Sequence, residues 1–148
     1  MSDAQILVAE KDNIVQLRVI GRCTFKISRP LRSLTQRRIR EGGKTFVIDF
    51  HDCTAMDSTF MGVLAMLGMG AREADSLVIL VNATEKHRDL LRGIGIAKLF
   101  SFSEQPTEEA SWTRLCDAAD SAIANEAHAE TILRAHKALV EADESNEP

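Results

Sequence analysis

Several residue types and patterns are scarce in this chain of 148 residues. Its three cysteines, Cys23, Cys53 and Cys116, are far apart and form no Cys-x-x-Cys pair, so the sequence suggests neither a disulfide framework nor a zinc site. No apolar run approaches the roughly 20 residues that cross a bilayer. The first residues also lack the basic, apolar and small-residue order of a signal peptide. We therefore expect a cytoplasmic protein that holds no metal and does not insert into membranes.

An excess of positive charge is also missing. Lys and Arg number 18 against 22 Asp and Glu, which gives a formal net charge of -4. Domains that bind nucleic acid usually carry a clustered basic excess. The one basic cluster, residues 37–40, is followed at once by Glu41, which is typical of a solvated helix end. We expect no nucleic-acid partner.

Strand patterns and helix patterns alternate through the first two thirds of the chain. Residues 14–20 alternate apolar and polar side chains, whereas residues 58–74 repeat apolar side chains at helical spacing. The expected order begins with a hairpin of strands 6–8 and 14–20, a helix from residue 28 to Gly42, and a strand over 45–50 that is covered on both faces. A polar loop over 51–57, a helix over 58–74 and a strand over 77–81 follow. The last elements are a helix over 84–92, with Leu90 and Leu91 directed inward, and a strand over 96–102. Strands joined through helices form a mostly parallel sheet. The sequence therefore predicts an α/β domain over residues 1–104, with a mixed sheet of four to five strands and flanking helices.

Residues 105–148 form a predicted helical extension. Gln105-Pro106 interrupts the alternation and Thr107 can cap a new helix. A second helical segment is expected over 129–142, and an acidic, frayed tail begins at Glu141. The region 125–128 has neither Gly nor Pro, so one bent helix and two separate helices both fit the sequence. The stripe expected to pack on the domain, or on a second copy in a homodimer, consists of Trp112, Leu115, Cys116, Ala119 and Ile123.

The segment Asp57-Ser58-Thr59 follows a buried strand, a short loop and Met56, and it opens the amphipathic helix. Unpaired backbone N–H groups and the positive end of the helix dipole favour negative charge at such a position. A phosphate on Ser58 would be tolerated there. In the simpler interpretation Asp57 and Ser58 only cap the helix.

These residues carry a resemblance to a known family. The chain resembles the STAS domain, and within it the bacterial anti-sigma factor antagonists, whose motif reads D-L-S-x-V-x-F/Y-M-D-S-S/T-G-L-G-V. The resemblance covers about residues 7–102 and includes Gly21 and the segment Gly93-Ile94-Gly95-Ile96. The motif positions that match are Asp49, Met56, Asp57, Ser58, Thr59, Gly62, Val63 and Leu64.

The resemblance implies a phosphorylation-controlled exchange of partners. Ser58 would be the phosphoacceptor, with Thr59 as a weaker candidate. The unmodified antagonist would bind an anti-sigma factor that is also a serine kinase, and a PP2C-type phosphatase would reset the system. ATP would belong to the kinase, so no cofactor is expected. The implied partner-binding residues are Thr24, Asp57, Ser58, Thr59, Phe60 and Met61.

The chain departs from the family pattern at two places near this motif. Phe60-Met61 replaces the usual Gly-Leu, and Arg22-Cys23-Thr24 replaces acidic residues after the early glycine. An alternative is therefore a STAS scaffold that is not phosphorylated, as a subunit of a transporter or of a larger signalling complex.

Enzyme motifs do not fit the chain. Ser58 with His51 or His87 could suggest a hydrolase, but the sequence has no G-x-S-x-G elbow, so this interpretation is not favoured. The fragment over residues 42–45 is similar to the end of a phosphate-binding loop, but it precedes a strand instead of following one. We expect no enzymatic activity.

Overall fold

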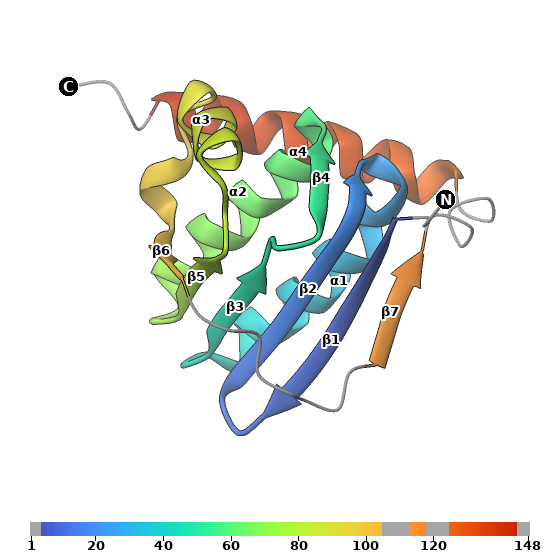
Figure 1. Cartoon of the computed structure of the whole chain (residues 1–148). Coiled ribbons are helices and arrows are strands. Elements are labelled where there is room, and N and C mark those ends of the chain that lie inside the picture. The colour runs from blue at the N-terminus through green and yellow to red at the C-terminus, as the bar shows by residue number, and fades with distance from the viewer. Residues whose placement is uncertain (1–3, 105–112, 118–124, 145–148) are drawn as a thin grey trace.

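A computed structural model describes residues 4–104, 113–117 and 125–144. The predicted α/β fold with a mixed sheet and a C-terminal helix is confirmed (Figure 1). The elements are β1 (Gln5–Lys11), β2 (Ile14–Cys23), α1 (Phe25–Glu41), β3 (Thr45–Asp49), β4 (Cys53–Met56), α2 (Ser58–Glu73), β5 (Leu77–Val81), α3 (Glu85–Gly93), the 3-10 turn η1 (Ala97–Leu99), β6 (Ser101–Ser103), β7 (Thr113–Asp117) and α4 (Asn125–Glu144).

Within the described residues the sheet has seven strands, with the order β6-β5-β3-β2-β1-β7 and with β4 attached to β2. β1 pairs antiparallel with β2 and β7, whereas the β2–β3, β3–β5 and β5–β6 pairs are parallel. The predicted hairpin turns through Asp12, whose φ of 55° lies in the left-handed region. Val15, Leu17 and Val19 are buried on β2 as their alternation predicts, while Gln16 is half-buried.

The sheet exceeds the predicted four to five strands because two segments pair with free backbone edges. β2 has ten residues and β3 only five, so the end of β2 extends past β3. Residues 53–56, predicted as loop, fill this space as β4 and pair Cys53 with Gly21. Buried backbone groups need such partners.

The second addition is β7, in the segment for which we predicted a helix from Thr107. That prediction was wrong for residues 113–117, which pair antiparallel with the edge strand β1 (Figure 1). Leu115 does pack against the core. The unpaired edge of β1 outweighs the local helical spacing of the apolar residues. Thr107, Trp112, Ala119 and Ile123 lie outside the described residues.

Helix boundaries follow their caps. α1 begins at Phe25, three residues before the prediction, because the Thr24 hydroxyl accepts a hydrogen bond from the Lys26 backbone N–H at 3.3 Å. Gly42, with φ of 73°, ends the helix as predicted. The segment predicted as a strand over 96–102 begins as η1, and only residues 101–103 form β6.

Two expectations about burial need correction. Leu91 is buried as predicted, but Leu90 is 36% exposed because it lies on the outer side of the short helix α3. Strand β3 is covered fully on one face and only in part on the other. Phe46 and Ile48 are buried in the core, whereas on the opposite face Val47 is half-buried and Asp49 is buried.

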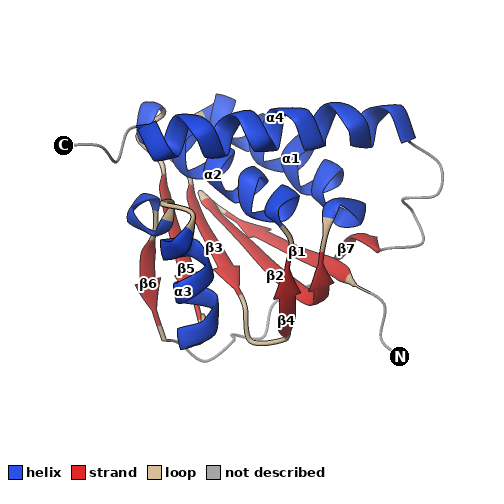
Figure 2. Cartoon of the chain, turned by 90° about the horizontal axis from the view of Figure 1, so that it is seen from above, coloured by secondary structure: helices blue, strands red, loops and turns tan. Residues whose placement is uncertain are grey.

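Figure 2 shows α4 as an outer layer that lies across α1 and α2. Residues 125–144 form one continuous helix. Over residues 131–142, where its side chains are described, the buried residues are Thr131, Ala135, Ala138 and Ala142, which recur at spacings of three and four residues. No helix of the described residues is long and apolar enough to cross a membrane.

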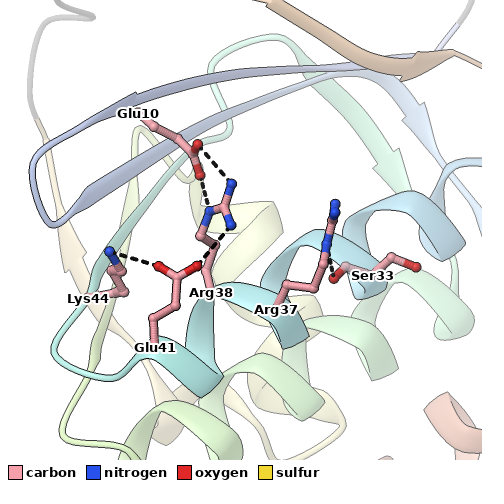
Figure 3. Close-up of polar contacts among 6 residues, drawn as sticks. All are labelled: Glu10, Ser33, Arg37, Arg38, Glu41 and Lys44. Carbon is pink, nitrogen blue, oxygen red and sulfur yellow. Dashed lines mark hydrogen bonds and ion pairs between the residues drawn. The ribbon is translucent and has the colours of Figure 1, made fainter.

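An ion-pair network fixes the end of α1 against β1 (Figure 3). Arg38 binds both carboxylate oxygens of Glu10 and also reaches Glu41 at 3.0 Å. Lys44 pairs with Glu41 at 3.1 Å. The hydrogen bonds from Arg38 hold the pKa of Glu10 below its ordinary value, and the hydrogen bond from Lys44 does the same for the pKa of Glu41.

We expect Leu80→Ala to lower the free energy of unfolding by roughly 2–5 kcal/mol, because this fully buried side chain leaves a cavity. Leu77→Ala is the matched control on the same strand. Leu77 is 61% exposed, so its loss should be less than about 0.5 kcal/mol. Urea unfolding monitored by circular dichroism measures both. Equal losses would contradict the described orientation of β5.

The Glu10–Arg38 pair predicts a pH dependence of stability. Since the pKa of Glu10 is lowered in the folded state, the charged carboxylate stabilises the fold above its unfolded pKa, and this contribution is lost as the pH falls through the folded pKa. Glu10→Gln should therefore reduce the change of the unfolding free energy with pH between about pH 3 and pH 6. Arg38→Gln should reduce it more because Arg38 also binds Glu41. An unchanged slope in both variants would refute the pairing.

Candidate functional site

The carboxylate of Asp57 joins the starts of two helices. One oxygen, Oδ1, accepts the backbone N–H of Phe60 at 2.8 Å and so caps α2. The other, Oδ2, accepts the backbone N–H of Phe25, the first residue of α1, at 2.9 Å. The positive ends of two helix dipoles therefore meet at one carboxylate. This corner of the molecule favours negative charge.

Three of the predicted site residues lie together at this corner. The backbone N–H of Asp57 donates to the carbonyl of Cys23 at 3.0 Å, which brings Asp57 next to the strand end that leads into Thr24. Thr24 and Asp57 are half-buried, and Ser58, the first residue of α2, is exposed. The Ser58 hydroxyl is thus accessible where the N-terminal N–H groups of α2 can stabilise an added anion.

The other three predicted site residues point inward. Thr59, Phe60 and Met61 are 5%, 0% and 6% exposed, respectively. Because each helix residue advances by about 100°, the chain turns from the surface into the core directly after Ser58. In this conformation the side chains of Phe60 and Met61 pack in the core behind Ser58, and they do not form part of the site's surface.

The structure adds a residue that sequence reasoning did not connect with the site. His136 on α4 lies with its Nε2 3.4 Å from the Ser58 hydroxyl oxygen, and both side chains are exposed. The two residues are 78 positions apart, so no local pattern could have paired them. The other histidines considered near Ser58 are engaged elsewhere. His51 pairs with Asp52, and His87 binds the carbonyl of Cys53.

A family model described as "Mlab, STAS domain" matches residues 6–101, which is more than half of the chain. The chain belongs to the STAS domain family. No curated protein matches it. The Asp57–Ser58 corner and β4 fall within the matched range, whereas β7 and α4 lie beyond it.

Solved structures show the same fold. The anti-sigma factor antagonist SpoIIAA in its unphosphorylated form is 18% identical, with a TM-score of 0.56, over 71% of this chain and 89% of SpoIIAA. The Bacillus cell fate determinant SpoIIAA in its phosphorylated form is also 18% identical. The match has a TM-score of 0.58 and covers 70% of this chain and 91% of SpoIIAA. A candidate anti-sigma factor antagonist from Thermotoga maritima is 15% identical. The match has a TM-score of 0.57 and covers 67% of this chain and 85% of that protein. At these identities the similarity establishes the fold.

The buried aspartate of the STAS motif organises the loop before the site. Asp49 is 4% exposed and accepts hydrogen bonds from the backbone N–H of His51 at 2.8 Å and from the Asn82 amide at 3.2 Å. It links the ends of β3 and β5 and fixes the path of the chain toward β4.

A pair of thiols lies beneath the site. Cys23 and Cys53 are buried, with their sulfur atoms 3.6 Å apart, and both are free cysteines. The hydrogen bond with Cys23 lowers the pKa of the Cys53 thiol, although burial acts in the opposite direction. Among the described residues, no group of three or more histidine, cysteine or acidic side chains is arranged to hold a metal ion.

Asp57→Ala should lower the free energy of unfolding by about 1–3 kcal/mol, because it removes one helix cap and leaves the Phe25 N–H without its acceptor. Asp57→Asn keeps one side-chain acceptor and should lose less. Urea unfolding gives the magnitude, and amide exchange at Phe25 and Phe60 shows where the loss occurs. Unaltered exchange at both amides in Asp57→Ala would contradict the double cap.

Proposed function

We propose that this STAS protein is an anti-sigma factor antagonist that acts in the cytoplasm and exchanges partners under the control of Ser58 phosphorylation. Its partner would be an anti-sigma factor that is also a serine kinase. The observation that carries the proposal is the placement of an exposed Ser58 at the first position of α2, beside the doubly bonded carboxylate of Asp57.

The electrostatics at this corner suit a modification that spares the fold. A phosphoryl group adds about -1.5 to -2 charges. The N-terminal N–H groups of α2 can accept this charge locally, because Ser58 is exposed and lies at the positive end of the helix dipole. At a protein interface the same charge beside Asp57 must be desolvated, which weakens the complex.

The similarity to SpoIIAA supports this interpretation. SpoIIAA is described in an unphosphorylated and a phosphorylated form, and this chain superposes on both with nearly the same TM-score, 0.56 and 0.58. A STAS domain of this shape therefore exists with and without phosphate. In this chain the modified residue would be Ser58, and a PP2C-type phosphatase would remove the phosphate.

The proposed partner surface is smaller than the sequence suggested. It consists of Thr24, Asp57 and Ser58, which share the corner between α1 and α2. Thr59 is a poor phosphoacceptor because its side chain is buried. No cofactor is needed by this chain, since ATP would be bound and consumed by the kinase.

The decisive experiment is to recover the chain from its native cells and to map phosphate by mass spectrometry. We expect one phosphoryl group, on Ser58, and none in Ser58→Ala. Thr59→Ala is the matched control and should be modified like the wild type. The anti-sigma factor that co-purifies with the chain should bind the wild type and Ser58→Ala. Ser58→Asp should fold normally and lose most of this binding. Full binding by a folded Ser58→Asp would refute phosphorylation control.

A second candidate is a STAS scaffold that is never phosphorylated, as a subunit of a transporter or of a larger signalling complex. The contact between Ser58 and His136 favours it, because a kinase needs free space around the hydroxyl. A stable complex that co-purifies with unmodified Ser58, and that tolerates both Ser58→Ala and Ser58→Asp, would decide for the scaffold.

A further inference from the structure

Helix α4 lies in direct backbone contact with α2 one turn beyond Ser58. A Cβ atom added at Gly62 would come within 2.5 Å of the Ala135 carbonyl oxygen and 2.6 Å of the Ala135 Cβ. Real Cβ atoms do not approach other atoms so closely, so any side chain at Gly62 must displace α4. The absence of a side chain at Gly62 therefore permits this helix pair.

Hydrogen bonds fix α4 along its length. Near its start, the Arg32 guanidinium of α1 donates to the Thr131 hydroxyl at 3.0 Å. In the middle, His136 approaches Ser58. Near its end, the Lys98 ammonium donates to the Ala142 carbonyl at 3.5 Å. The helix consequently extends from α1, over the first turns of α2, to the region of η1.

The buried apolar side chains under α4 are mostly small. Among the described side chains of α4, Ala135, Ala138 and Ala142 are buried and Leu139 packs against the core while partly buried, whereas Leu133 and Val140 are 71% and 58% exposed on its outer side. Hydrophobic stabilisation scales with the apolar area that is buried, so alanine contributes much less than leucine. Segments held by few apolar contacts open at a lower free energy than the core. For this reason we expect α4 to open at a lower free energy than the sheet.

We infer that α4 is a detachable cover that competes with the partner for the Ser58 end of α2. This inference rests on the proposed function, since it concerns the regulation of the same site. A kinase or binding partner must surround the Ser58 hydroxyl, and His136 occupies one side of it at 3.4 Å. Partner binding then requires the open state, and its affinity falls with the fraction of molecules in which α4 is detached.

The test compares two glycine substitutions on the same helix. In Gly62→Ala the new Cβ meets the backbone of α4. In Gly70→Ala the new Cβ meets only the side chain of Ile39 on α1, with the Cδ1 atom at 3.1 Å and the Cγ2 atom at an ordinary contact distance of 3.7 Å. Both substitutions replace a helical glycine with the same residue and so improve intrinsic helix propensity alike. The pair therefore isolates the contact with α4.

Hydrogen exchange on the full chain gives the readout. We expect α4 amides to exchange faster than those of β2 and β3 in the wild type. In Gly62→Ala, exchange in α4 and at residues 58–61 should rise roughly tenfold or more, the effect of an overpacked contact, with β2 and β3 unchanged. Gly70→Ala should leave α4 as in the wild type. Thr131→Val, which removes the hydrogen bond from Arg32, should accelerate α4 exchange in the same direction.

The inference is overturned if α4 exchanges only together with β2 and β3, in the wild type and in all three variants. The helix would then be a permanent part of the fold. Because this measurement involves no kinase, it stands apart from the phosphorylation experiment. If α4 opens but Ser58 is never phosphorylated, the detachable helix is supported and the proposed function is refuted. If the kinase modifies Gly62→Ala no faster than Gly70→Ala, the cover does not control access to Ser58.

Discussion

The carboxylate of Asp57 is the constraint on which the candidate site depends. Its two oxygens accept the backbone N–H of Phe25, the first residue of α1, and the backbone N–H of Phe60, in the first turn of α2. This double cap sets the spacing between α1 and α2, presents Ser58 to solvent and draws Thr24 alongside. The positive ends of the same two helices give this corner its preference for negative charge. Structure and proposed chemistry therefore depend on one residue.

The elements beyond the STAS match extend the fold on two sides. Strand β7 covers the free edge of β1, and α4 adds a third layer above α1 and α2. The strand pairs with β1 and itself becomes the edge of the sheet in the described residues. The helix instead lies on the surface that a partner of Ser58 would need. The extension thus adds one strand to the sheet and places His136 of α4 beside Ser58.

Sequence reasoning worked where neighbours along the chain decide the outcome. The alternation of Val15, Leu17 and Val19 and the cap at Asp57 are local patterns, and both appear as expected. It failed at residues 53–56 and 113–117, where local composition favours a loop and a helix. There, the unpaired backbone of β2 and β1 determines the structure. Phe60 was placed on the partner surface although its position after the first turn directs it inward.

By itself the sequence determined the α/β class, the STAS motif and the position of Ser58 at a helix start, because periodicity and capping act over a few residues. Tertiary structure alone decided that Thr24 lies beside Asp57, that Met61 is buried and that His136 reaches Ser58. It also decided that α4 turns its alanines inward and leaves Leu133 in solvent. These outcomes depend on contacts between distant segments, such as the approach of α4 to α2, which is possible because Gly62 has no side chain.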